Sequence, residues 1–517
     1  MTKTAETNSR ISDLWSQLEA APHTPLADLF AGDPARVEAM TRRLEWPGPE
    51  GEITGMRIDW SKTHLSPETI SLFEELSAAC GFAEAREALF SGGIVNVTEG
   101  RAANHGAMRG SGTDADTEEA AALLARMGML VDAIHEGALG DVKHLIHIGI
   151  GGSALGPALA VDALTRDLAK VDVHVVSNVD GLALEQAFAA CDPATTMIAV
   201  ASKTFTTIET MTNAASALAW LEKEGVEDPS GRVVALTASP EKAVSWGVDE
   251  TRILPFPESV GGRYSLWSSI GFPVALAIGM EEFREFLGGA QAIDTHFRAT
   301  EGRDNAPLMA AYVDQYYSRI RDCQTRAVFA YDERLDLLPD YLQQLEMESN
   351  GKSVTVDGEA VSGPTAAITW GGVGTDAQHA VFQLLHQGTR LVPVDFIASI
   401  APGDALDPAH HRTLLMNCLA QGAALMAGKP SADDPARAYR GDRPSTMFLL
   451  DDLDPATLGA MIAFHEHRTF ANAVLMGINP FDQFGVELGK AIANQIDAGE
   501  GSFDASTLAL MEAAGLR

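Results

Sequence analysis

A glutamate in the middle of the chain is the first candidate for acid–base chemistry. Glu348 ends an apolar, helix-like stretch and is followed by the polar turn Ser349-Asn350-Gly351-Lys352. A carboxylate in such a place is either a solvated surface charge or a base that points into a cleft. Glu346, two residues earlier, would face another side of a helix. The interpretation of Glu348 as a base requires other segments that could bind a substrate or stabilise its charge.

Two further segments carry groups that could assist a base. Arg263 follows Gly261 and Gly262, whose lack of side chains permits close backbone approach. A fixed guanidinium there could stabilise developing negative charge, although a structural salt bridge is the common alternative. His379 and His386 are seven residues apart, which would place both on one face of a helix. An imidazole can titrate near neutral pH, but such a histidine is more often packed or hydrogen-bonded.

A glycine turn between a strand and a helix indicates an anion site. Gly149-Ile150-Gly151-Gly152-Ser153-Ala154 follows an apolar run and opens a helix-like segment. Backbone N–H groups at such a turn can bind a phosphate. The turn also fits a loose dinucleotide-binding pattern, but the next strand ends Ser177-Asn178 and lacks the acidic residue which that pattern requires. A tight turn that binds nothing is the remaining alternative.

A second strand–helix junction is rich in hydroxyl groups. Ser202-Lys203-Thr204-Phe205-Thr206-Thr207 follows the apolar run at 195–201 and precedes a helical stretch. One such residue would be an ordinary N-cap. A cluster with an ammonium group is better suited to surround a phosphate, and two such turns from one parallel sheet would meet at its carboxyl edge.

These parts match the needs of an aldose–ketose isomerisation of a sugar phosphate. A base moves a proton between C2 and C1, a cation stabilises the enediolate, and an acid–base pair opens the ring. This chemistry requires neither a metal nor an organic cofactor. His410-His411 and His465-Glu466-His467 lack the i, i+4 spacing and carboxylate partners of a metal site, so we expect them to be structural and expect no metal.

Composition excludes several classes of partner. The formal net charge is −34 over 517 residues, which argues against binding to nucleic acid or to an anionic membrane surface. The four cysteines have no CxxC spacing, and the N-terminus has no apolar core of a signal peptide. The longest uncharged run, Tyr264 to Met280, contains Pro273 and is typical of a buried helix. We therefore expect a cytoplasmic protein with reduced cysteines.

The order of apolar runs predicts an α/β fold with mainly parallel sheets. Residues 1–100 have mainly helical spacing. Beyond residue 143, short apolar runs alternate with helix-like segments, as expected for βαβ units. Strands are expected within 143–150, 171–177, 195–202 and 232–237, and a second set within 326–332, 366–370 and 390–397.

Several segments together resemble the phosphoglucose isomerase family, that is, glucose-6-phosphate isomerases. The resemblance rests on segments that occur in the family's order from about residue 95 to the C-terminus. They are GIGGSALGP (149–157), SKTFTTIET (202–210), VGGRYSLWSSIG (260–271), LPDYLQQLEMESNGK (338–352), AQHAVFQLLHQGT (377–389) and INPFDQFGVELGK (478–490).

The resemblance implies a fold, an activity and an assembly. It implies two sugar-isomerase-type three-layer αβα domains and interconversion of glucose 6-phosphate and fructose 6-phosphate by a homodimer with shared active sites. We place a helical N-terminal segment at 1–107, packed on the larger domain, and a smaller α/β domain at 108–276. The larger α/β domain would span 277–485, and a helical tail would span 486–517.

The resemblance also implies roles for individual residues. Glu348 matches the family's base and Arg263 the residue beside the enediolate. His379 and Lys490 match the ring-opening pair, although the context of Lys490 alone would suggest a solvated lysine. In the family the histidine at the His379 position comes from the neighbouring subunit. The implied substrate contacts are Gly152, Ser153, Ser202, Lys203, Thr204, Thr207, Gln344 and Gln483.

The chain departs from the family pattern at a few positions, and alternatives remain. Ala154, Asp376 and Phe484 are among the departures, and those near His379 bear on the setting of that histidine. An isomerase of mannose or amino-sugar phosphates would share the base. A non-catalytic sugar-phosphate sensor would keep the phosphate loops without needing one. A nicotinamide-dependent dehydrogenase is disfavoured by the missing acidic residue.

Overall fold

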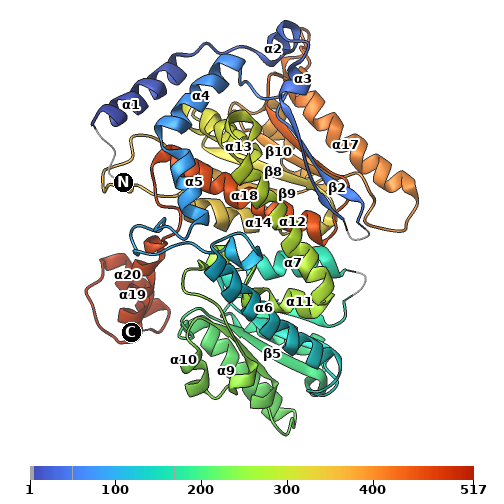
Figure 1. The fold of residues 1–517 in the computed structure, drawn as a ribbon, viewed down its shortest axis with the longest axis vertical. Coiled ribbons are helices and arrows are strands. Elements are labelled where there is room, and N and C mark those ends of the chain that lie inside the picture. Colours follow the sequence, from blue (N-terminus) through green and yellow to red (C-terminus); the bar gives the residue numbers. More distant parts are fainter. Residues whose placement is uncertain (1–4, 49–50, 167–168, 517) are drawn as a thin grey trace. The chain divides into compact units, whose positions relative to one another are not determined.

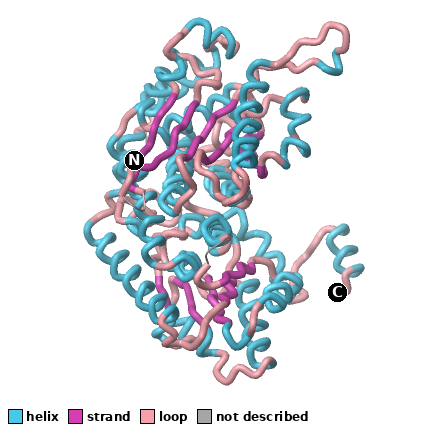
Figure 2. Tube along the Cα trace, turned by 90° about the vertical axis from the view of Figure 1, so that its right-hand side faces the viewer, coloured by secondary structure: helices cyan, strands magenta, loops and turns pink. Residues whose placement is uncertain are grey.

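The fold was analysed in a computed structural model, which describes residues 5–48, 51–166 and 169–516. The chain forms two compact units, Met1–Pro480 and Phe481–Arg517. The strands of the first unit lie in two separate sheets (Figures 1 and 2). The second unit contains α19 (Glu487–Asp497) and α20 (Ala505–Ala513).

One sheet has five parallel strands in the order β4-β3-β5-β6-β7. Its strands are β3 (His144–Ile148), β4 (Asp172–Val176), β5 (Thr196–Ala201), β6 (Val233–Thr237) and β7 (Ile253–Pro255). The middle strands β5 and β6 are buried along their whole length, as expected for a parallel sheet covered on both faces. The neighbouring strands β3 and β5 run parallel, so the loops after them leave the same edge.

The other sheet has six strands in the order β1-β2-β11-β10-β8-β9. Four of them are parallel: β8 (Thr325–Tyr331), β9 (Ile368–Val373), β10 (Val394–Ser399) and β11 (Ser445–Leu450). The seven strands expected from the sequence are confirmed. Sequence patterning missed β7 and β11: β7 is only three residues long, and β11 mixes buried with half-buried positions.

The N-terminal segment, expected to be helical, also contains a β-hairpin. β1 (Thr41–Pro47) pairs antiparallel with β2 (Ile53–Asp59), and β2 pairs antiparallel with β11. Leu44 and Trp46 are buried while Arg43 and Glu45 face outward, so the apolar residues alternate with a period of two. Sequence patterning missed this hairpin, whereas the other described elements of residues 5–90 are all helices, as the mainly helical spacing predicted.

Helices connect the strands and cover the sheets (Figure 1). Instead of one buried helix at 264–280, the chain forms the 3₁₀ turns Gly262–Tyr264 and Ser269–Gly271 and then the short helix α11 (Phe272–Ile278). Residues 263–280 are buried, as expected. None of the described helices is long and apolar enough to cross a membrane. Helices of the first unit with at least nine residues include α1 (Ala5–Ala20), α4 (Pro67–Ala79), α5 (Phe82–Phe90), α6 (Asp114–His135), α7 (Leu155–Thr165), α8 (Gly181–Ala190), α9 (Ile208–Lys223), α13 (Ala306–Gln315) and α17 (Pro408–Ala427).

Two long helices cross at the centre of the first unit. α12 (Met280–Ala299) packs against α18 (Pro455–Met476), which is buried along almost its entire length. A Cβ atom at Gly289 would lie 1.8 Å from the carbonyl oxygen of Ala456, and one at Gly459 would lie 1.9 Å from that of Phe286. The two glycines therefore set the distance of closest approach between the helices.

The predicted domain boundaries after residues 107, 276 and 485 stay predictions. The strands of the five-stranded sheet lie within 108–276, and four strands of the other sheet lie within 277–485. His465, Glu466 and His467, expected to be structural, lie inside α18. Among them, His467 Nε2 contacts Asp294 at 2.6 Å and Glu466 accepts a hydrogen bond from the Trp267 indole at 2.8 Å.

The close crossing of α12 and α18 makes a matched pair of glycine substitutions informative. Gly289→Ala should lower the free energy of unfolding by roughly 1–3 kcal/mol, because the added methyl group overpacks the crossing. Gly288→Ala, on the same helix, meets open space and should be neutral or stabilise by about 0.5–1 kcal/mol through helix propensity. Urea denaturation of both variants checks this, and equal stabilities would contradict the packing argument.

Candidate active site

The glycine turn leaves the carboxyl end of β3 as a 3₁₀ turn, Gly151–Ser153, before α7. Gly151 has a φ of 56°, which favours glycine. A Cβ at Gly152 would lie 2.2 Å from the carbonyl carbon of Gly262 and 2.4 Å from the amide nitrogen of Arg263. Gly152 therefore lets the turn contact the backbone of the segment that carries Arg263.

A buried histidine forms a hydrogen bond with the backbone of this turn. His147 is fully buried on β3, and its Nε2 lies 2.7 Å from the carbonyl oxygen of Ser153. Burial lowers the pKa of His147 to about 4, so the ring is neutral at pH 7 and Nε2 donates to the carbonyl. Sequence analysis did not select His147. Its only signal is a polar residue in the middle of an apolar strand.

The hydroxyl-rich junction follows β5, the strand next to β3. The Ser202 and Thr207 hydroxyl oxygens lie 3.1 Å apart, and those of Thr204 and Thr206 lie 2.9 Å apart. Thr207 is the N-cap residue of α9, but its side chain does not bond the helix backbone. The hydroxyl groups are therefore available at a helix N-terminus, where an anion is favoured.

Lys203 bridges this junction to the segment before Arg263. Its Nζ donates to the carbonyl oxygens of Glu258 at 2.6 Å and Val260 at 3.1 Å. Burial and, to a smaller extent, the charge of Arg101 lower the pKa of Lys203 to about 8. Two of the three ammonium donors are thus directed at backbone carbonyls, and one remains for another partner.

The stretch that carries the candidate base ends in a π-helical turn. α14 (Leu338–Gln343) continues as the π-turn Gln344–Glu348, a feature that often occurs at functional sites. Gln344 Nε2 donates to Glu348 Oε2 at 2.8 Å. The same Nε2 would lie 3.0 Å from a Cβ atom at Gly151, so Gln344 touches the glycine turn. The Glu348 side chain is 19% exposed, which is neither fully solvated nor sealed.

Arg263 fixes the other oxygen of this carboxylate. Its side chain is 1% exposed, and Nη1 donates to Glu348 Oε1 at 2.9 Å. Nε donates to Ser349 Oγ at 2.7 Å, and Nη2 donates to the carbonyl oxygen of Pro480. Three partners on one guanidinium leave it little freedom. The carboxylate and the cation are therefore held in a fixed relation.

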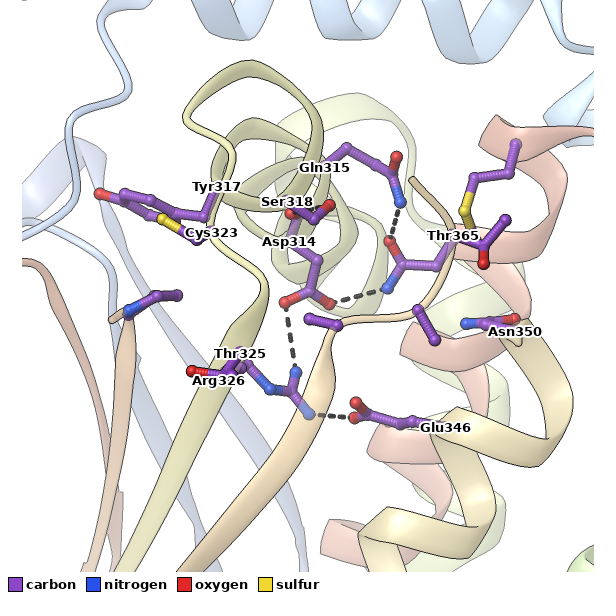
Figure 3. A pocket seen from close by; sticks show the side chains of 15 residues that line it. Asp314, Gln315, Tyr317, Ser318, Cys323, Thr325, Arg326, Glu346, Asn350 and Thr365 are labelled. Atoms are coloured by element: carbon purple, nitrogen blue, oxygen red, sulfur yellow. Dashed lines mark hydrogen bonds and ion pairs between the residues drawn. The ribbon is translucent and has the colours of Figure 1, made fainter. Parts of the chain in front are cut away.

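A buried ion network anchors the opposite side of the π-turn (Figure 3). Glu346 accepts hydrogen bonds from Arg326 and from the Thr369 hydroxyl, the latter at 2.9 Å. Arg326 also contacts Asp314 at 3.2 Å, and Arg468 bonds Asp314 through two nitrogens. Burial alone would raise the pKa of Asp314, but the two arginines lower it to about 2. Glu346 thus faces inward, away from Glu348, as expected.

These contacts bring together residues far apart in the sequence. The glycine turn touches the Arg263 segment through Gly152 and touches Gln344 through Gly151. Arg263 and Gln344 each donate to one oxygen of Glu348. The candidate base therefore lies beside the glycine turn, not on a remote surface.

His379 and His386 do not share a helical face as expected. The segment forms two short helices, α15 (Asp376–Ala380) and α16 (Phe382–Gln387), because Val381 leaves the helical conformation with a φ of −126°. His386 Nε2 lies 2.9 Å from the side-chain oxygen of Gln421, which fits a structural role. His379 is exposed. Hydrogen bonds and ion pairs of the described chain do not link it to Glu348.

Two predicted site residues lie in the second unit. Gln483 is exposed before the 3₁₀ turn Phe484–Val486, and Lys490 is exposed on α19. α19 has apolar residues on one side, among them Leu488, which is 70% exposed, and Ile492, which is 37% exposed. The roles of Gln483 and Lys490 stay predictions.

Fold and site define a class of protein: a two-sheet α/β protein with a glutamate–arginine pair beside a glycine turn at a strand end. Residues 59–511 match the family described as Phosphoglucose isomerase. Glucose-6-phosphate isomerases of Erythrobacter litoralis and Zymomonas mobilis are 69% and 58% identical to this chain. The first alignment covers 99% of both chains and the second 98% of both.

The solved structures agree. A glucose-6-phosphate isomerase from Chlamydia trachomatis superposes with a TM-score of 0.87 at 27% identity, covering 98% of this chain and 99% of that one. This chain belongs to the phosphoglucose isomerase family. The resemblance expected from the sequence is thereby confirmed, as is the α/β fold class.

Sequence reasoning missed residues whose importance depends on tertiary contacts. Ser349 accepts from Arg263 and lies 2.9 Å from the Tyr264 hydroxyl, yet a serine after a glutamate gives no signal by itself. Arg326 and Asp314 were also missed, because neither neighbours a motif in the sequence.

The buried His147 predicts a specific pH dependence of stability. Its pKa falls from 6.5 to about 4 on folding, so the unfolded chain binds more protons between these values. Stability is therefore lost as pH falls from about 6.5 to about 4, by up to roughly 3 kcal/mol for this group. His147→Gln can still donate to Ser153 and should lose less stability over this range. Urea denaturation of both proteins at pH 7 and pH 5 measures the difference, and parallel pH profiles would contradict it.

Proposed function

We propose that this protein is an aldose–ketose isomerase that interconverts glucose 6-phosphate and fructose 6-phosphate, a reaction of glycolysis and gluconeogenesis. The single observation that carries the proposal is the position of Glu348 between Arg263 and Gln344, beside the glycine turn. Family membership and relatives named glucose-6-phosphate isomerase support the same activity. The relatives give no support to an isomerase of another hexose phosphate, to a sensor or to a dehydrogenase.

The phosphate would bind at the carboxyl edge of the five-stranded sheet. Ser153 lies in the glycine turn, and Ser202, Thr204 and Thr207 lie at the start of α9. Hydroxyl and N–H donors at two adjacent strand ends can surround one phosphate group. Lys203 would contribute its remaining donor and its positive charge.

The proton transfer would be carried by Glu348. Its carboxylate removes the proton from C2 and returns it to C1, while the negative charge of the enediolate develops beside the Arg263 guanidinium. Arg263 is already fixed by Ser349 and Pro480, so it needs little rearrangement when that charge appears. A prearranged cation of this kind typically contributes about 3–4 kcal/mol to transition-state stabilisation.

Ring opening would require His379 and Lys490, and we propose a homodimer that completes the site. An exposed His379 on α15 is accessible to a second copy of the chain. We also propose a cytoplasmic location, because all four cysteines are free and buried.

An assay that offers three substrates in parallel tests the proposed specificity. We expect fructose 6-phosphate to be converted far faster than mannose 6-phosphate or glucosamine 6-phosphate, with glucose 6-phosphate as the product. Comparable turnover of mannose 6-phosphate would assign a broader isomerase. Binding of all three sugars without turnover would assign a sensor.

The role of Glu348 predicts the outcome of an isosteric substitution. Glu348→Gln should lower kcat by about 10²–10⁴-fold or more, because the amide cannot accept the C2 proton. Fructose 6-phosphate should still bind, as measured by calorimetry, since the phosphate loops are unchanged. Glu359→Gln, at an exposed carboxylate on the same segment, is the matched control and should be fully active. Near-normal turnover by Glu348→Gln would remove Glu348 as the base.

A further inference from the structure

The amino edge of the five-stranded sheet, opposite the active-site edge, carries two histidines on neighbouring strands. His144 opens β3 and pairs in register with Asp172 of β4, while Ile146 pairs with His174. Side chains two residues apart on a strand share a face, so His144 and His174 lie diagonally on the same face of the sheet. That is also the face on which Ile146 and Val176 pack in the apolar core with Leu184 of α8.

A cysteine completes the cluster. Cys191 is the residue that ends α8, in the connection between β4 and β5, and it is buried. One ligand atom from each of His144, His174 and Cys191 can be chosen so that all three lie within 4.8 Å of one another. Two imidazoles and a thiol from three separate places in the sequence thus converge at one point.

The imidazole groups in this cluster have ring nitrogens that could bind a metal ion. Nδ1 of His144 is buried and has no hydrogen-bond partner within residues 5–48, 51–166 and 169–516. A buried polar atom in that state costs free energy unless something binds it. His174 is half-buried on β4, and a neutral imidazole carries one ring nitrogen with a lone pair that can bind a metal.

A carboxylate is also close by. Asp172 lies two residues before His174 on the same face of β4 and is exposed at the sheet edge. Asp172 is also the in-register partner of His144, so it lies beside both histidines on that face of the sheet. The cluster therefore has a candidate fourth ligand as well as access to solvent.

We propose that His144, His174 and Cys191 form a binding site for Zn²⁺ or a similar borderline divalent cation, with Asp172 or water as the fourth ligand. Nitrogen and sulfur ligands in this number suit tetrahedral zinc. Ligand atoms around such an ion are about 3.4–3.6 Å apart, as follows from metal–ligand distances of about 2.0–2.3 Å. Small side-chain rotations from the present positions would reach this geometry.

Binding would replace the S–H bond of Cys191 by an S–Zn bond and release one proton to solvent. The ion would tie together β3, β4 and the α8–β5 connection. The ion would have a structural role, because it would bind near the amino end of β3, whereas the glycine turn follows the carboxyl end. The five-residue strand separates the two by roughly 15 Å.

A second cluster of this kind is a weaker candidate. His23, His64 and Asp442 also come within 4.8 Å of one another. However, His64 Nε2 already contacts Asp442 at 3.0 Å, and the Arg321 guanidinium donates to His23 Nδ1. A cation there would have to displace existing bonds and would be repelled by the arginine.

Cobalt is a suitable probe, because Co²⁺ occupies zinc sites and gives a thiolate charge-transfer band in the near ultraviolet. The full-length protein, stripped of metal by a chelator, is titrated with Co²⁺ and then with Zn²⁺. We expect a thiolate band that saturates at one equivalent per chain and is abolished by Zn²⁺. Zn²⁺ should also raise the melting temperature. Absence of the band from the folded protein would overturn the proposal.

Three variants locate the ion. Cys191→Ala should abolish the band and the effect of Zn²⁺ on melting, and His174→Gln should weaken Co²⁺ binding at least tenfold. Cys418→Ala removes a buried cysteine of α17, which packs against the six-stranded sheet, and should leave both signals unchanged. Circular dichroism and isomerase activity confirm that each variant is folded. A band that persists in Cys191→Ala, or that is lost only in Cys418→Ala, would refute the site.

Discussion

The contact between Arg263 and Glu348 is the interaction on which the proposed site depends. A guanidinium that is 1% exposed holds a carboxylate that is 19% exposed, so a buried cation positions a partly exposed base. Removing either partner would leave the other without its main counter-charge. Ser349 and Pro480 restrict the guanidinium further, and Gln344 restricts the carboxylate. The base and the charge-stabilising group are thus prearranged before any ligand binds.

This contact is possible because the backbones of two loops of the five-stranded sheet, those after β3 and β7, approach each other closely. Gly152 has no side chain, and any Cβ there would collide with the Gly262–Arg263 backbone. On the other side, Arg326 draws Glu346 into the interior and so fixes the rotation of the π-turn. One end of the site is set by the absence of a side chain and the other by a buried ion network. The proposed metal site lies at the opposite, amino edge of the five-stranded sheet and does not overlap these contacts.

Sequence patterns predicted those elements of the fold that are determined by residues adjacent in the chain. The apolar runs of β3 and β5 and the turns after them follow from a few adjacent residues. The β1–β2 hairpin escaped prediction because its partner, β11, lies almost 400 residues away. Glu348 could be chosen as a candidate base from the sequence. Its hydrogen bond with Arg263 could not be predicted, because the two residues are 85 positions apart and no local pattern links them. The roles of His379 and Lys490 came only from family resemblance, because each is an exposed residue without a distinctive context.

The most direct test is a crystal structure with a stable, phosphorylated analogue of the enediolate. The account predicts that the phosphate binds the Ser153 and Ser202 loops, while a Glu348 oxygen lies within about 3.2 Å of the atoms that represent C1 and C2. The Arg263 guanidinium should face the oxygens that carry the negative charge. A phosphate bound elsewhere, or a Glu348 carboxylate that reaches neither carbon, would contradict the account.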